Sequence, residues 1–186
     1  MTDVTDQIAA YGTDVSAPAA AVVVMGVAGA GKSTLAVAIA DRLSAVFVEA
    51  DDLHSAEAKA QMAAGIPLTD EDRWPWLGRV AARVRDELAM GHPVVASCSA
   101  LKRSYREFLT RVSGTRLAFV HVHGSEAELA ERIGHRTGHF MPASMLASQL
   151  VTLEPLAADE RGIVVPLGLP VDDAAARALE FLRRHA

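Results

Sequence analysis

Residues 22–34 read VVVMGVAGAGKST, a short apolar run followed by a loop of small residues. The loop matches the phosphate-binding pattern G-x-x-x-x-G-K-[ST] at every fixed position. In such a loop, backbone N–H groups surround phosphate oxygens, the lysine brings positive charge to the β- and γ-phosphates, and the serine hydroxyl reaches Mg²⁺. The sequence therefore predicts a site for ATP and Mg²⁺, formed by Gly26, Ala28, Gly29, Ala30, Gly31, Lys32, Ser33 and Thr34.

A helix is expected directly after the loop, because Leu35, Ile39 and Leu43 recur at every fourth position. Further along, helical patterns alternate with short apolar runs, which are typical of parallel strands buried on both faces. The expected strands are 21–25, 46–49, 94–97, 117–123 and 163–167. This order predicts an α/β, three-layer P-loop NTPase fold: a five-stranded parallel sheet with helices on both faces.

Helix starts have their own sequence signals. Serine followed three residues later by glutamate is the capping-box spacing, so residues 104–107 and 125–128 are each expected to open a helix. Asp172 or Asp173 is expected to cap a last helix that runs to Arg184. The inward residues of that last helix are expected to be Ala176, Leu179 and Leu182.

The composition indicates one globular domain, with 186 residues of which 51% are hydrophobic and 22% charged. The net charge of −5 provides no basic field for nucleic acid, and no apolar run approaches the ~20 residues of a membrane span. The single cysteine, Cys98, excludes an internal disulfide and suits the cytoplasm. Residues 1–18 lack the features of a signal peptide and are expected to form a flexible tail before a single domain, 19–186.

Acidic residues follow the second expected strand, at Glu49, Asp51 and Asp52. In parallel sheets, ligands bind at the carboxyl ends of the strands, which is where these residues fall. The third strand ends without the aspartate that often helps to hold Mg²⁺ in such NTPases. Glu49 and Asp51 can point the same way on an extended chain. One of them could then orient the metal's waters while the other accepts a proton from a substrate hydroxyl.

Positive charge gathers in three further places. Arg73 lies in a segment with both tryptophans, where it either forms a surface ion pair or faces an anionic substrate. Ser99, Lys102 and Arg106 follow the third strand and are expected beside the phosphates. Residues 132–141 combine arginines, histidines and glycines between two helices, a composition typical of a mobile lid that closes over a transferred phosphoryl group.

Several segments resemble the gluconate kinase (gluconokinase) family, whose members are small P-loop kinases similar to nucleoside monophosphate kinases. These segments are 26–34, 49–54, 65–77, 98–106 and 138–155. The phosphate loop alone is unspecific, whereas PLTDEDRWPW (67–76) together with SALK (99–102) is highly specific. The resemblance implies a cytoplasmic homodimer that transfers phosphate from ATP to the 6-hydroxyl of D-gluconate, giving 6-phosphogluconate for the pentose phosphate and related routes.

The resemblance also implies roles for the reacting groups. Asp51 would hold the sugar-acid hydroxyls and deprotonate the 6-hydroxyl. By analogy with related kinases, Arg136 would support the γ-phosphoryl group. The phosphate loop itself assigns Lys32 to the β- and γ-phosphates and Ser33 to Mg²⁺, and the position of Glu49 after the second strand assigns it to Mg²⁺ as well.

Further roles concern the two ligands. Arg132 would stack on adenine opposite the turn at Leu169 and Pro170. The lid would span about 134–141. Gluconate would be surrounded by His54, Arg73, Ser99, Lys102 and His139, with Gln149 as a weaker candidate.

Three alternatives use the same loop. A kinase for shikimate or another small hydroxy acid would share the scaffold, but the segment RWPW (73–76) is unexpected there. A nucleotide switch protein would need a guanine-reading Asn-Lys-x-Asp segment, which the chain lacks. A nucleic-acid-binding ATPase is disfavoured by the acidic charge balance and by the lack of a stripe of aromatic and basic residues.

Overall fold

The computed structural model describes residues 21–134 and 143–185. Within them, strands form one sheet in the order β2-β3-β1-β4-β5, and all neighbouring strands are parallel. The strands are β1 (Ala21–Met25), β2 (Val46–Glu49), β3 (Val94–Ser97), β4 (Ala118–His123) and β5 (Gly162–Pro166). The predicted five-stranded parallel sheet is confirmed. Only β4 and β5 differ from the expected limits: β4 starts one residue later, and β5 starts and ends one residue earlier.

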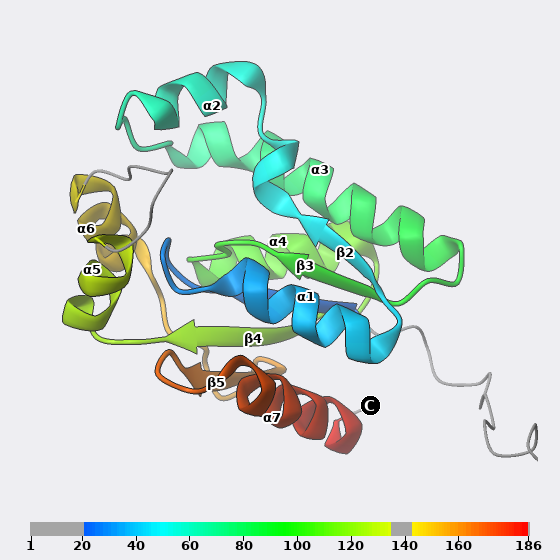
Figure 1. Ribbon diagram of the computed structural model, residues 1–186. Coiled ribbons are helices and arrows are strands. Elements are labelled where there is room, and N and C mark those ends of the chain that lie inside the picture. The colour runs from blue at the N-terminus through cyan, green and yellow to red at the C-terminus, as the bar shows by residue number, and fades with distance from the viewer. Residues whose placement is uncertain (1–20, 135–142, 186) are drawn as a thin grey trace, which may run out of the picture.

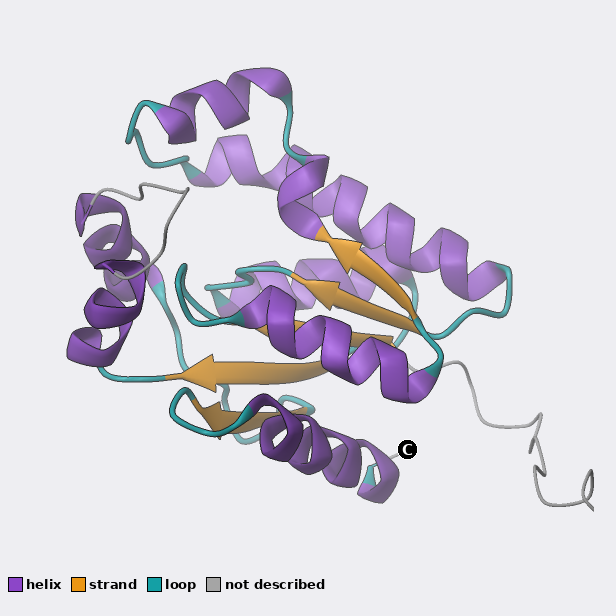
Figure 2. Ribbon diagram, viewed as in Figure 1, coloured by secondary structure: helices purple, strands orange, loops and turns teal. Residues whose placement is uncertain are grey.

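Helices cover both faces of the sheet (Figure 1). One face packs against α1 (Lys32–Leu43) and α7 (Val171–Arg184), and the other against α3 (Asp70–Ala89) and α4 (Arg103–Ser113). The short 3₁₀ helix η2 (Ala50–Leu53) and α2 (Ala56–Ala63) follow β2. Beyond the carboxyl end of β4 lie α5 (Glu126–Gly134) and α6 (Ala143–Thr152), as Figure 2 shows. The three-layer prediction is therefore confirmed.

The central strand β1 is buried on both faces. Val22 and Val24 belong to the core under α1 and α7, whereas Val23 and Met25 belong to the core under α3 and α4. Side chains alternate between the faces of a strand, so a strand covered on both sides needs apolar residues at every position. This is why β1 reads as a continuous apolar run.

The two predicted capping boxes have different outcomes. The one at 125–128 is confirmed: the Glu128 carboxylate accepts from the Ser125 backbone N–H at 2.7 Å, and Ser125 Oγ accepts from the Glu128 N–H at 3.3 Å. The one at 104–107 is wrong, because α4 begins at Arg103 and its first N–H donates to Glu154 Oε2 at 2.6 Å. A distant side chain thus caps α4, and Glu107 pairs with Arg103 instead.

The start of the last helix is also corrected. Pro170 precedes α7, so Asp172 and Asp173 lie within its first turn rather than at its cap. Acidic side chains remain favourable there because of the helix dipole, and Asp172 pairs with Arg42 of α1 at 2.6 Å. The helix runs to Arg184 as predicted, but Ala176 is exposed. The buried face consists of Ala174, Ala175, Ala178 and Leu182.

Two predicted features cannot be placed. The tail at 1–18 and residues 135–141 of the predicted lid lie outside the described residues. Within the part of the chain that is described, no helix has both the length and the apolar character needed to cross a membrane.

Candidate active site

The phosphate loop connects β1 to α1 at the carboxyl edge of the sheet. Gly26 has a φ of 137°, and a Cβ atom there would lie 2.7 Å from the carbonyl oxygen of Val122. Gly29 and Gly31 have φ of 79° and 84°, a region that glycine enters at little cost. Because Gly31 precedes α1 and offers no side chain as a cap, the N–H groups of the first helical turn can bind an anion.

Polar side chains meet beside this loop. Ser33 Oγ donates to Glu49 Oε2 at 2.6 Å and lies 3.3 Å from Ser97 Oγ, at the end of β3. Lys32 Nζ donates to the carbonyl oxygen of Val27 at 3.1 Å, so its ammonium group lies across the loop. A carboxylate and a hydroxyl are ligands that Mg²⁺ accepts, usually together with substrate phosphates and water. The predicted pair Ser33 and Glu49 therefore fits a metal held mainly by the nucleotide.

Asp51 and His54 lie on the η2 side of the site. The Asp51 side chain is 73% exposed, and His54 Nε2 is 3.9 Å from its Oδ1 atom. The His54 ring stacks on Trp76, with 4.2 Å between centroids, and its Nδ1 atom is buried with no hydrogen-bond partner among the described residues. Burial lowers the pKa of His54, although Asp51 opposes this. An accessible carboxylate thus stands beside an imidazole that is neutral at pH 7.

Trp76 fixes the position of this imidazole. It lies on α3 and is 2% exposed, and its Nε1 atom donates to the carbonyl oxygen of Ala50 at 2.7 Å. The start of α3 is itself fixed by a capping box between Thr69 and Asp72. The specific PLTDEDRWPW segment therefore sets the position of α3 against η2.

Arg73 and Lys102 approach the same region from α3 and from the start of α4. Lys102 Nζ lies 2.6 and 2.8 Å from the two Asp70 carboxylate oxygens, and the Tyr105 hydroxyl donates to Asp70 at 2.5 Å. These hydrogen bonds hold the pKa of Asp70 below its usual range. Arg73 and Lys102 also face the Tyr105 ring, 5.9 and 5.6 Å from its centroid. Sequence reasoning missed Asp70 as the residue that positions Lys102.

Ser99 lies in the loop that follows β3. Its carbonyl oxygen accepts from the backbone N–H of Gly26 at 3.3 Å, which joins this loop to the phosphate loop. The next residue, Ala100, is fully buried and has a φ of 41°, a left-handed conformation that is unusual for a residue with a side chain. Strained backbone of this kind is concentrated at functional sites.

Arg106 is not part of the phosphate site, contrary to the prediction. Its side chain is 1% exposed and donates to both Glu160 carboxylate oxygens, at 2.5 and 2.8 Å. It also donates to the carbonyl oxygens of Ala100, Leu101, Glu154 and Pro155. Arg106 therefore holds the loop that carries Ser99 and Lys102, and it is a structural residue.

Gln149 of α6 reaches the phosphate loop. Its Oε1 atom accepts from the backbone N–H of Ala28 at 2.7 Å. Ala28 is one of the loop residues predicted to bind phosphate. Gln149 was only a weak candidate from the sequence, and no local pattern could reveal a contact between residues so far apart.

A small cavity of about 100 Å³ adjoins the other side of the phosphate loop. Arg132 lies on one of its walls, where its Nη2 atom donates to the carbonyl oxygen of Leu167 at 2.9 Å. Leu169 and Val171, the neighbours of Pro170 in the chain, also line the cavity. The cavity has a cation, apolar walls and the phosphate loop at its edge, as an adenine site requires.

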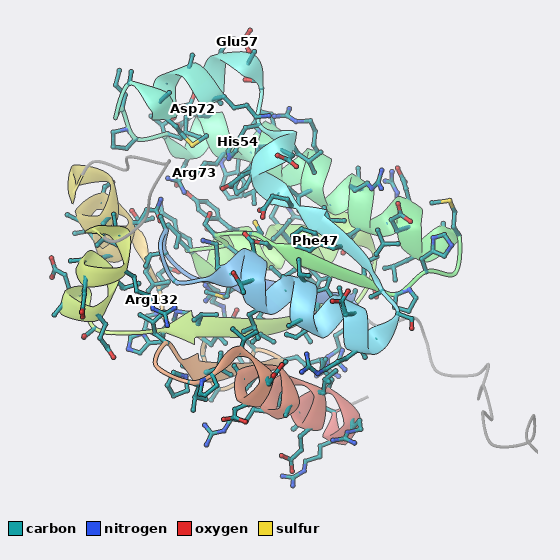
Figure 3. All side chains as sticks on the ribbon, viewed as in Figure 1. Phe47, His54, Glu57, Asp72, Arg73 and Arg132 are labelled. Carbon is teal, nitrogen blue, oxygen red and sulfur yellow. The ribbon has the colours of Figure 1, made fainter. Side chains whose placement is uncertain are left out.

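Most of the predicted residues therefore lie around one edge of the sheet. Figure 3 shows His54 and Arg73 on the side formed by η2 and α3, and Arg132 across the phosphate loop from them. Arg136 and His139 lie outside the described residues.

The chain is similar to known P-loop proteins over most of its length. The family model described as "AAA domain" matches residues 22–156, so the chain belongs to that group of P-loop proteins. A solved structure of a sugar kinase from Janibacter sp. HTCC2649 is 47% identical, with a TM-score of 0.85 over 89% of this chain and 95% of that one. The fold and the phosphate loop are thus those of a P-loop kinase.

Two further relatives define the family. Gluconokinase from Gluconobacter oxydans (strain 621H) is 50% identical over 88% of this chain and 89% of its own length. The crystal structure of a gluconokinase from Sinorhizobium meliloti 1021 is 49% identical, with a TM-score of 0.81 over 91% of this chain and 94% of that one. The chain belongs to the gluconokinase family.

Proposed function

We propose that this protein transfers the γ-phosphoryl group of ATP to the 6-hydroxyl of D-gluconate, giving 6-phospho-D-gluconate. The main observation is that an accessible carboxylate, Asp51, lies at the same sheet edge as the phosphate loop, with Arg73 and Lys102 nearby. This arrangement suits an acceptor that carries both hydroxyl groups and a negative charge. The high identity to gluconokinases over most of the chain supports the same substrate.

Asp51 is proposed as the general base. Its exposure leaves its carboxylate oxygens open to a substrate hydroxyl, and a base within hydrogen-bond reach of that hydroxyl can accept its proton as the phosphoryl group arrives. The neighbouring His54 is held neutral by burial, so it does not neutralise Asp51 through an ion pair. The 6-hydroxyl would then attack phosphorus in line with the departing ADP oxygen.

The transferred phosphoryl group would be stabilised by positive charge. Lys32 is proposed to contact the β- and γ-phosphates, and Arg136 to reach the γ-phosphoryl group from the lid proposed at about 134–141. Ser33 and Glu49 would hold Mg²⁺, which neutralises charge on the β- and γ-phosphates when it is bound. Closure of that lid would exclude water and limit wasteful hydrolysis of ATP.

The two ligands would occupy opposite sides of the phosphate loop. Adenine would lie in the cavity between Arg132 and the turn at Pro170. Gluconate would lie between η2 and the start of α3, with its carboxylate on a cation. The residues proposed to surround it are Asp51, His54, Arg73, Ser99, Lys102 and His139.

The biological setting is also a proposal. Residues 19–186 would form a single P-loop kinase domain after a tail at 1–18. The protein would act in the cytoplasm as a homodimer, with no nucleic-acid or membrane partner, and its product would enter the pentose phosphate route.

A coupled assay of ADP release across a panel of sugar acids tests this function. We expect turnover with D-gluconate, none with 6-deoxygluconate, and little with shikimate. Lys32→Ala should lower turnover by roughly 10²–10³-fold or more, since it removes a transition-state cation. Preference for shikimate, or unchanged turnover with 6-deoxygluconate, would refute the proposed reaction.

A further inference from the structure

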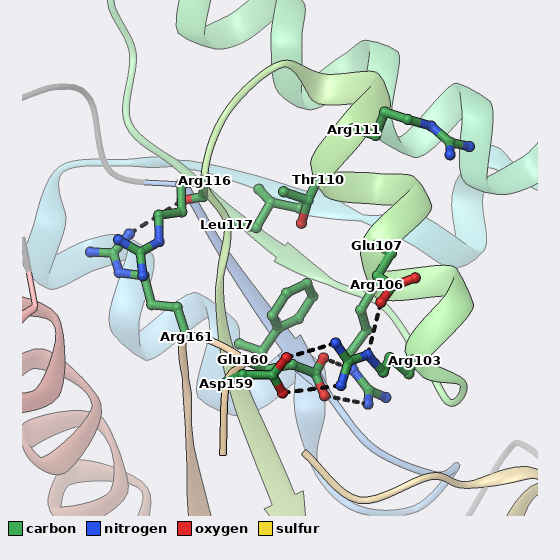
Figure 4. A pocket seen from close by; sticks show the side chains of 11 residues that line it. Arg103, Arg106, Glu107, Thr110, Arg111, Arg116, Leu117, Asp159, Glu160 and Arg161 are labelled. Carbon is green, nitrogen blue, oxygen red and sulfur yellow. Dashed lines mark hydrogen bonds and ion pairs between the residues drawn. The ribbon is translucent and has the colours of Figure 1, made fainter. Parts of the chain in front are cut away.

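A second cavity, of about 320 Å³, lies on the α4 side of the sheet (Figure 4). It shares no lining residue with the phosphate loop or with the proposed adenine cavity. One wall is α4, another is the segment that leads into β5, and Leu117 and Phe119 lie between them. Five arginines and three acidic residues complete the lining. The volume falls at the lower end of the range for small-molecule sites.

All three acidic residues of this cavity already have partners. Asp159 forms a two-fold contact with Arg103 at 2.8 and 3.0 Å, and Glu107 bonds to the same guanidinium. Glu160 is occupied by Arg106. Three carboxylates and two guanidinium groups thus pair with one another at one end of the cavity, and each acid contacts Arg103 or Arg106 rather than Arg116 or Arg161.

The other end has unbalanced positive charge. Arg116 lies two residues before β4 and Arg161 lies directly before β5, and Figure 4 shows their guanidinium groups next to each other. Arg161 Nη1 donates to the Arg116 carbonyl oxygen at 3.2 Å, while its Nε atom is buried with no partner among the described residues. Within those residues neither arginine forms an ion pair. Burial, and then the charge of Arg116, lower the pKa of Arg161.

We propose that Arg116 and Arg161 bind the phosphate group of a small anion, either inorganic phosphate or a phosphomonoester. Two adjacent guanidinium groups match the oxygens of a phosphate, which they can contact in a bidentate manner. A phosphate would offset the repulsion between the two cations, because it places negative charge beside both guanidinium groups. The remaining cavity, which Leu117 and Phe119 help to line, has room for the carbon part of an ester.

This site is separate from the proposed catalytic site. Arg116 and Arg161 precede their strands, at the amino ends, whereas ligands of the reaction bind at the carboxyl ends. A phosphate bound there is therefore not the group that is transferred. Occupancy would also affect stability, because the ligand binds the folded chain.

Calorimetric titration of the full chain tests the proposal, with the phosphate loop saturated by a non-hydrolysable ATP analogue and Mg²⁺. The probes are inorganic phosphate and glycerol 3-phosphate, at matched ionic strength. We expect one site per chain, and at least ~10-fold weaker binding in Arg116→Ser/Arg161→Ser, since charge-assisted hydrogen bonds are lost. Tighter binding of glycerol 3-phosphate would identify a phosphomonoester as the ligand, and equal or weaker binding would identify inorganic phosphate.

The matched control is Arg177→Ser/Arg183→Ser, which removes two exposed arginines of α7 and gives the same change in net charge. It should bind the probe as the natural chain does. The single variant Arg116→Ser replaces an exposed side chain and provides the same test if the double variant does not fold. The proposal is overturned by no binding at tens of millimolar probe, or by equal affinity in the Arg116 variants and the natural chain.

Discussion

Asp51 is the residue through which the proposed transfer is most directly tested. Asp51→Asn keeps the shape of the side chain but cannot accept the hydroxyl proton, so kcat should fall by about 10²–10⁴-fold. Affinity for ATP should stay nearly unchanged, because Asp51 does not contact the phosphate loop in the proposed arrangement. Steady-state kinetics with gluconate and a nucleotide-binding titration measure the two effects.

Asp52→Asn is the control, since Asp52 is an exposed neighbour in η2. It should leave kcat within a few-fold of the natural value. If Asp51→Asn retained kcat and raised only the KM for gluconate, Asp51 would bind the substrate without acting as the base.

His121 should make the fold sensitive to acid. It is 3% exposed, both ring nitrogens lack partners among the described residues, and burial lowers its pKa to about 4. The unfolded chain therefore takes up a proton near pH 6.5 while the folded chain does not. Stability is full above pH 6.5 and falls as the pH drops to 4, by about 3 kcal/mol from this residue.

Urea unfolding at pH 7 and at pH 4.5 measures this loss. His121→Leu should flatten the pH dependence, whereas His185→Leu, at an exposed histidine, should not. An unchanged pH dependence in His121→Leu would exclude this histidine as its source.

Residue roles could be predicted from the sequence only where local pattern determines them. The phosphate loop was readable because its glycines and lysine are required at fixed spacing. The prediction that Arg106 lies beside the phosphates was wrong because its role depends on Glu160, 54 residues away in the sequence. An arginine that is paired with a buried carboxylate stabilises the fold and is not available to bind a ligand. Asp70 was missed because it appears in the sequence as one of several acids in the first turn of a helix.

At the scale of elements, parallel strands were the most predictable part of the fold. Burial on both faces makes β1 and β3 short, mainly apolar runs, and both strands have the predicted limits. The edge strand β2 also has its predicted limits, although it is only partly buried. Helix starts were less certain, because a cap can come from a distant element. Glu154 caps α4 in place of Ser104, and Pro170 shifts the start of α7.

The contact between α6 and the phosphate loop leads to a prediction on ATP binding. Gln149 accepts from the Ala28 N–H, a group that a bound phosphate would also use, so the two compete. Gln149→Ala should therefore bind a non-hydrolysable ATP analogue about 2–10-fold more tightly, the range of one net hydrogen bond. Gln61→Ala is a matched control, because Gln61 lies in α2 and its side chain donates to the carbonyl oxygen of Pro67 instead of contacting the phosphate loop.

Fluorescence titration with a labelled ATP analogue measures both variants. Weaker binding in Gln149→Ala would mean that Gln149 contributes to the nucleotide site instead of competing with it.

At the scale of the whole molecule, strand order decides where the chemistry lies. After β1 the chain forms β2 and β3, which both lie on one side of β1 in the sheet. It then crosses β1 and forms β4 and β5 on the other side. Such a reversal opens a crevice at the carboxyl ends of the strands. It is here that the phosphate loop after β1 meets Ser97 at the end of β3 and Glu49 at the end of β2. The alternation of strands and helices predicted this edge, but the distances within it depend on the packing of α3 and α4.

The Arg106–Glu160 pair connects two distant parts of this molecule: the loop after β3 with the start of α4, and the segment that leads into β5. Arg106→Met would leave the Glu160 carboxylate largely buried without its partner, so the free energy of unfolding should fall by about 3–5 kcal/mol. Arg103→Met removes solvent-exposed pairs with Asp159 and Glu107, which water screens, so its loss of stability should be much smaller. Urea unfolding compares the two.

Arg106→Met/Glu160→Gln should recover part of the loss, because the double variant leaves no unpaired buried charge. Arg106 also holds the carbonyl oxygens of Ala100 and Leu101, so its loss should loosen the loop that carries Ser99 and Lys102. We therefore expect Arg106→Met to raise the KM for gluconate more than the KM for ATP, at a temperature where the variant is folded. A loss of stability no larger than that of Arg103→Met, with an unchanged KM for gluconate, would contradict this structural role.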